Sequence, residues 1–319
     1  MDTPVTLSQT PVRLGRWATS KSLARSAWHA LTLDKELIWL PLLSIISSLG
    51  LCTVFIGVLI GSGQLQMGDF TTGESASTDV SIFGPLSVFI YTVFYLSMTF
   101  VANFFAAALV AGFLERFRGG NPTVGSALKA AHVHAGAIFA FSLLSATIGL
   151  VLRAIEERVP LFGKVVTWVL GAAWAIASMF ALPVIVATDK NVGPIKATKQ
   201  SVGIITKTWG ENVILSVGLG LVSVVTILAY FALSVGAWFV LAAFATASGI
   251  LSIGFIPVAI FFAVVVLGFA VLCIIFNTLS AVIKTAIFHY ATTGESPAAF
   301  EKQLLQQSFT SKKARGIFN

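Results

Sequence analysis

The longest apolar stretch of the chain runs from Asn212 to Ile283 and contains no Asp, Glu, Lys, Arg or His. A helix needs about 20 apolar residues to cross the hydrocarbon core of a bilayer. The stretch is too long for one crossing and predicts two. Turn-forming residues gather near its middle, for example Gly249 and Pro257. We therefore expect a hairpin of two membrane helices, at about 212–241 and 256–283.

Four earlier segments have the same apolar character and are separated by polar connectors. They lie at about 37–61, 82–114, 135–152 and 165–188. Each is long enough to cross a bilayer or nearly so. Together with the uncharged hairpin, they predict an all-α membrane protein with six transmembrane helices arranged as three hairpins.

The composition supports an integral membrane protein. Hydrophobic residues make up 56 % of the chain and charged residues 10 %, with a mean hydropathy of +0.91. Soluble domains carry about 25 % charged residues. The spans and their connectors leave no room for a separate soluble catalytic domain. We expect one membrane domain over 12–300, flanked by a disordered N-terminal segment (1–11) and a basic tail (301–319).

The basic residues indicate which side of the membrane each connector occupies. Lys and Arg are concentrated in the two terminal segments and in the second and fourth connectors; the exceptions are Arg153, Arg158 and Lys164. Connectors that carry excess Lys and Arg stay in the cytoplasm. The charge pattern therefore predicts a multi-pass protein of the cytoplasmic (inner) membrane, with both termini on the cytoplasmic side.

A basic, helix-like segment precedes each predicted hairpin, at 12–33, 123–134 and 194–209. The first has two tryptophans on an amphipathic pattern, which is typical of a helix lying in the membrane interface. Its candidate lipid-contacting residues are Arg13, Arg16, Trp17, Lys21 and Arg25. Packing on the protein's own cytoplasmic face would explain the same pattern, and both interpretations stay open.

The third basic segment has the most regular pattern. The segment predicts a helix that starts near Pro194 and carries an apolar stripe of Ile195, Val202, Ile205 and Trp209. The candidate lipid-contacting residues of this segment are Lys196, Lys199, Lys207 and Trp209. Basic residues near an anionic membrane surface contribute about 1 kcal/mol each to binding. The alternative is that they only fix the topology and that the tryptophan is an interfacial anchor.

Polar residues inside or beside the spans are few. Asn103 and Asn277 fall within predicted spans, where they would line a pathway or form hydrogen bonds between helices. A charged cluster follows the third span and consists of Arg153, Glu156, Glu157 and Arg158. Its helical spacing permits ion pairs along one helix. The cluster is either part of a pathway for ions or protons or a solvated turn that caps the hairpin.

Catalytic patterns are missing from the sequence. It contains no zinc-protease helix motif, no phosphate-binding glycine loop and no serine-nucleophile elbow. His132 and His134 point to different faces of a helix, which makes them a poor metal site. We expect no metal, no cofactor and no enzymatic activity. No Asp, Glu, Lys or Arg falls within the predicted bounds of the spans, and this argues modestly against ion-coupled transport.

Several stretches spread over almost the whole chain resemble those of one prokaryotic family of six-span membrane proteins, a domain of unknown function. They are Ser26–Trp28, Asp34–Leu37, Leu150–Arg158, Gly193–Ala197 with Ser201, Lys207–Asn212 and Tyr290–Pro297. The Gly193–Ala197 connector is also loosely similar to that of membrane domains that accompany glycerophosphodiester phosphodiesterases. The catalytic domain of those enzymes is lacking, so these resemblances imply a fold and a topology but no activity.

Two functions of different classes fit these observations. The first is a non-enzymatic membrane scaffold or lipid-interacting protein, which would bind anionic membrane lipids and associate with a second copy or a protein partner, but not with nucleic acid. The alternative is a small-molecule or lipid transporter, with Asn103, Asn277 and the Arg153–Arg158 cluster near its path. A cavity at mid-membrane that touches Asn103 or Asn277 would favour transport, whereas a solid core would argue against it.

Overall fold

The computed structural model describes residues 34–63, 84–158, 162–188, 192–207, 212–248 and 256–295, together with Thr32 and Pro297. These residues form helices and no strand, and six helical segments are long and apolar enough to cross a membrane. The prediction of an all-α membrane protein with six spans is thus confirmed. The predicted lipid-contacting residues from Arg13 to Arg25, and Trp209, lie outside the described residues.

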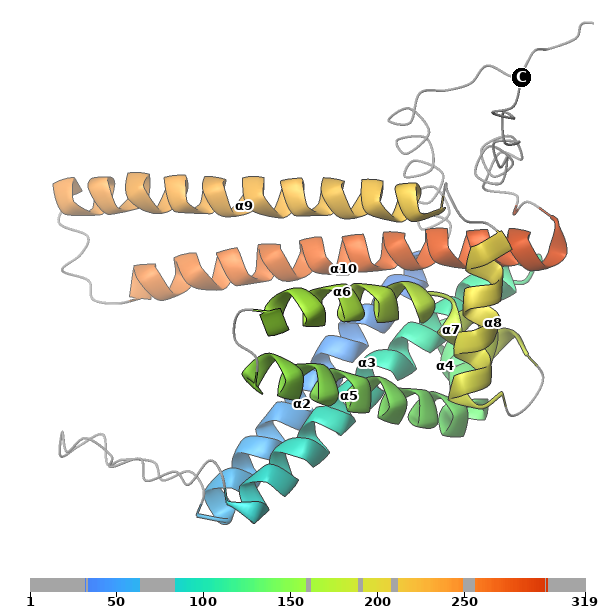
Figure 1. Ribbon diagram of the computed structural model, residues 1–319. Helices are drawn as coiled ribbons and strands as arrows, with labels where there is room; N and C mark the ends of the chain where they lie inside the picture. Colours follow the sequence, from blue (N-terminus) through green and yellow to red (C-terminus); the bar gives the residue numbers. More distant parts are fainter. Residues whose placement is uncertain are drawn as a thin grey trace, which may run out of the picture.

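The long helices form three hairpins (Figure 1). The first pairs α2 (Trp39–Gly61), which follows the short 3₁₀ helix η1 (Lys35–Ile38), with α3 (Pro85–Phe117). The second pairs α5 (Ala135–Arg158) with α6 (Phe162–Ala177), which continues as α7 (Ala181–Ala187). The third pairs α9 (Asn212–Ser248) with α10 (Ile256–Thr293). Short helices α4 (Val124–Val133) and α8 (Pro194–Lys207) precede the second and third hairpins.

Helix α3 is the centre of the bundle, because it packs against α2, α4, α5, α7 and α10. The buried core lies toward one end of the long helices, where η1, α4, α7 and α8 also gather. It includes Phe113 of α3, Phe180 before α7 and Ile287 of α10. Farther from this end, α9 and α10 pack on each other and expose apolar side chains such as Val240 and Val264. Exposed apolar faces of this kind are solvated by lipid.

The sixth span continues beyond its predicted end at residue 283. Helix α10 runs on to Thr293 and stops where Gly294 adopts a positive φ of 75° and donates from its N–H to the carbonyl of Tyr290. A glycine in this conformation is a common helix terminator. Helix α10 contributes buried residues to the core from Thr278 as far as His289. Lys284 is therefore part of the helix and does not mark its end.

Polar contacts connect the start of the first hairpin to the end of α3. Asp34 is buried and accepts two hydrogen bonds from the guanidinium of Arg116, which also donates to Asn121. The carboxylate of the neighbouring Glu115 accepts a 2.8 Å hydrogen bond from the hydroxyl of Ser126 on α4. These contacts join η1, α3 and α4 into one unit at the core end of the bundle.

Candidate functional site

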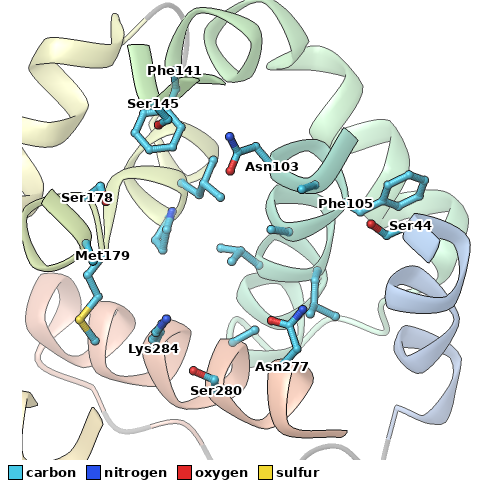
Figure 2. A pocket seen from close by; sticks show the side chains of 18 of the residues that line it. Ser44, Asn103, Phe105, Phe141, Ser145, Ser178, Met179, Asn277, Ser280 and Lys284 are labelled. Atoms are coloured by element: carbon cyan, nitrogen blue, oxygen red, sulfur yellow. The ribbon is translucent and has the colours of Figure 1, made fainter. Parts of the chain in front are cut away.

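A cavity of about 440 Å³, partly open at the surface of the bundle, lies between α2, α3, α5, the α6–α7 segment and α10 (Figure 2). Sites for small ligands measure about 300–1,000 Å³. Most lining side chains are apolar. The polar lining residues include Asn103, Ser145, Ser178, Asn277, Ser280 and Lys284. The two asparagines that the sequence singled out thus meet at one cavity, although they are far apart in the chain.

One wall of the cavity depends on a break between α6 and α7. Pro183 has no backbone N–H and its ring displaces the carbonyl four residues earlier, so the helix cannot continue regularly through this point. The chain makes a turn at residues 178–180 before α7 begins, and the Ser178 hydroxyl donates a 2.8 Å hydrogen bond to the carbonyl of Trp174. The break turns Trp174, Ser178 and Met179 toward the cavity.

Asn103 forms the opposite, α3 wall. Its side-chain amide donates a 3.0 Å hydrogen bond to the hydroxyl of Ser142 on α5. That hydroxyl is buried and donates in turn to the carbonyl of Ile138, at 2.8 Å. Asn103 therefore forms the interhelical hydrogen bond that the sequence analysis considered, and it also lines the cavity.

Helix α10 contributes a row of polar groups. Asn277, Ser280 and Lys284 lie at positions i, i+3 and i+7, which place them on one face of a helix. Figure 2 shows their side chains rising from α10 into the cavity. Among the residues that the structure describes, none forms an ion pair or hydrogen bond with these three side chains. Their hydrogen-bonding capacity is available to water or to a ligand.

Lys284 is the charged cavity residue that the sequence analysis missed. The expectation that the spans contain no charged residue was wrong, because a lysine was taken as the end of the sixth span. On insertion scales, a lysine at the centre of a transmembrane helix costs about 2.5–3.5 kcal/mol, and charges in spans mark functional sites by default. The periodic polar positions Asn277, Ser280 and Lys284 were the available signal.

The charged cluster at the far end of α5 is separate from the cavity. Arg153 donates a 3.0 Å hydrogen bond to Glu157, and both side chains are well exposed. Glu156 and Arg158 are exposed as well. None of the four lines the cavity. Their arrangement matches a solvated end of the hairpin.

Helix α8 packs on α5, α6 and α7 through small residues. Ala197 and Ser201 are fully buried with Ile205, and the Ser201 hydroxyl accepts a 3.0 Å hydrogen bond from the N–H of Phe180. The predicted apolar stripe was therefore only partly right. Two of its members, Ile195 and Val202, are exposed, as are the candidate residues Lys196 and Lys199. Lys207 is the last residue of the helix.

No group of His, Cys, Asp and Glu suited to hold a metal ion occurs among the described residues. His134 instead lies within 2.9 Å of the carbonyl of Ala130 and within 3.4 Å of that of Thr188. These contacts join the start of α5 to the end of α7.

The six apolar helices and their arrangement define a multi-pass α-helical integral membrane protein. The chain belongs to a family of unknown function, DUF6159. The model of this family matches residues 84–298. The match runs from the start of α3 to just beyond α10 and agrees with the resemblance to a family of unknown function. Comparison with curated proteins and with solved structures found no match. Nothing links the chain to the membrane domains that accompany glycerophosphodiester phosphodiesterases.

Proposed function

We propose that the protein is a transporter or permease-like protein that binds a small polar or amphiphilic molecule in the interior cavity and performs no enzymatic chemistry. The observation that carries this proposal is the cavity itself, which touches both Asn103 and Asn277. A scaffold needs no such space. Unsatisfied polar groups inside a membrane bundle are costly, and they occur mainly along substrate and ion pathways.

The depth of the cavity supports the same function. At a rise of 1.5 Å per residue, Asn103 lies roughly 21 Å along α3 from Phe117, and Lys284 roughly 14 Å along α10 from Thr293. The hydrocarbon core of a bilayer is about 30 Å thick. With the core end of the bundle at the predicted cytoplasmic face, these depths correspond to the middle of the membrane.

Thiol accessibility tests the transport proposal. Ser145 lines the cavity, and Ser145→Cys would be made in a chain whose two cysteines are replaced, Cys52→Ala and Cys273→Ala. The matched control is Val264→Cys, at an exposed, lipid-facing position on α10. In proteoliposomes, a membrane-impermeant methanethiosulfonate reagent is added to one side at a time.

Alternating access predicts that the Ser145→Cys thiol reacts from both sides of the membrane, because the cavity opens to each in turn. The Val264→Cys thiol should not react from either side, because lipid keeps it protonated and away from the reagent. A cavity thiol that reacts from one side only, or from neither, contradicts transport.

A membrane scaffold or lipid-interacting protein is the second candidate, and the exposed face of α8 favours it. Lys199 lies between the exposed apolar residues Ile195 and Val202, a combination suited to an anionic membrane surface. Such a protein would act by associating with a second copy or a protein partner. The combined change Lys196→Gln, Lys199→Gln and Lys207→Gln should then lower the share of anionic lipid that copurifies with the protein. Lys164→Gln, on the predicted outer side, is the control. An unchanged lipid profile would argue against this function.

A further inference from the structure

We propose that the interior cavity binds an oxyanion, the phosphate or carboxylate group of a small amphiphile, and that Lys284 is its counter-ion. This inference rests on the proposed function and names the chemical class of the molecule that enters the cavity. The ammonium of Lys284 would hold the anionic group, with the amide of Asn277 and the hydroxyl of Ser280 as hydrogen-bond donors beside it.

The charges of the cavity favour an anion. Lys284 is the one charged residue among those that line it. The carboxylates of the described residues are occupied elsewhere or exposed. Asp34 pairs with Arg116, Glu115 accepts from Ser126, and Glu157 pairs with Arg153. Glu36, Glu156 and Glu295 are exposed. The described part of the chain thus supplies no internal counter-ion, and an ammonium in a low-dielectric site requires one.

The donors lie along one wall of the cavity. Asn277, Ser280 and Lys284 share a face of α10, so this wall offers an amide N–H, a hydroxyl and an ammonium to a bound group (Figure 2). Charge-assisted hydrogen bonds to an oxyanion are the strongest that such donors form. A neutral molecule would leave the charge of Lys284 without a partner.

The remaining walls suit an apolar group attached to the anion. Phe141 and Trp174 stack on each other with ring centroids 6.4 Å apart, and Met179 and Leu182 lie beside them in the lining. These side chains come from α5 and from the α6–α7 segment, and Figure 2 shows Phe141 on the far side of the cavity from Lys284. The cavity thus combines a cationic group on α10 with an aromatic pair on α5 and α6, a combination suited to a small amphiphile with an anionic head.

Two sources supply this chemistry, a phospholipid head group from the bilayer and a soluble phosphate ester from water. Phosphatidylglycerol and glycerol 1-phosphate represent them with the same phosphate and glycerol groups. A third possibility is that the long side chain of Lys284 turns to the membrane surface and needs no ligand, as lysines near helix ends do.

The test uses the Ser145→Cys reporter in the cysteine-replaced chain, because Ser145 lines the cavity but is not one of the proposed donors. Its rates with an anionic, a cationic and a neutral methanethiosulfonate are each divided by the rate of the same reagent with free cysteine. With Lys284 present, the anionic reagent should be favoured over the cationic one by about tenfold, since one nearby charge attracts the first and repels the second.

Lys284→Gln should abolish this preference, and Lys284→Arg should restore it. Lys129→Gln removes an exposed charge of α4 and should leave the preference unchanged. An unchanged rate with the neutral reagent shows that each variant keeps its cavity. A reporter that reacts without charge preference, or with a preference that survives Lys284→Gln, overturns the oxyanion proposal and leaves the proposed function standing. A reporter that does not react with any reagent overturns both.

The source is then identified by protection against the neutral reagent. A lipid head group is supported if the reaction is slower in bilayers of phosphatidylglycerol than in bilayers of phosphatidylcholine and if Lys284→Gln removes this difference in rate. Slower reaction on addition of glycerol 1-phosphate, again lost in Lys284→Gln, supports a soluble phosphate ester. If neither probe slows the reaction in a Lys284-dependent way, the oxyanion proposal is overturned.

Discussion

The ion pair between Asp34 and Arg116 should stabilise the bundle measurably, and Asp34→Asn tests it. The Asp34 side chain is 3 % exposed and that of Arg116 30 % exposed. Removing one partner of a fully buried pair costs about 3–5 kcal/mol. Because Arg116 is partly hydrated and asparagine still offers one acceptor oxygen, we expect a smaller loss, of about 2 kcal/mol in the free energy of unfolding.

The matched control is Arg153→Gln, which breaks the exposed pair with Glu157 on α5. An exposed pair at this spacing contributes about 0.3–0.5 kcal/mol. Unfolding would be followed by circular dichroism while dodecyl sulfate is titrated into mixed micelles. The double variant Asp34→Asn with Arg116→Gln should lose less than the two single losses added together, because the partners share one interaction. Equal, small losses for Asp34→Asn and Arg153→Gln would refute the stabilising role of the buried pair.

Three further substitutions probe the core and helix α8 by the same titration. Gly112→Ala would bring a new Cβ to 2.7 Å from the end of Leu37, so we expect a loss of about 1–3 kcal/mol. Gly203→Ala on α8 meets no atom within 4 Å and should be neutral or stabilising by up to about 1 kcal/mol. Equal effects of the two would contradict the close approach. Ser201→Ala removes the acceptor of the buried Phe180 N–H and should lower the free energy of unfolding by about 1–3 kcal/mol. A loss below roughly 0.5 kcal/mol would show that water replaces the hydroxyl.

The six spans were predictable because the preference of an apolar helix for lipid is a property of the segment alone. The absence of charge from Asn212 to Ile283 was sufficient to predict the third hairpin. The end of α10 was not predicted, because the lysine at the apparent boundary outweighed the periodic polar positions before it. Burial in the core holds the helix through residues such as Ile287, and this burial depends on packing.

The candidate site was predictable in part. Asn103 and Asn277 stood out as polar residues in apolar segments, but their meeting at one cavity depends on how α3 and α10 pack. The buried face of α8 was missed because hydrophobicity favoured Ile195 and Val202. The bundle instead accepts the small residues Ala197 and Ser201, which let helices approach closely.

Mass spectrometry of the intact protein, purified gently in native lipid, is the most direct test that the interior cavity binds a ligand. The wild type and Lys284→Gln would be compared under identical conditions. The cavity and its unpaired lysine predict that the wild type retains one anionic molecule at defined stoichiometry and that Lys284→Gln loses it. A wild type that carries no such molecule, or a variant that retains it equally well, would contradict a binding role for the cavity.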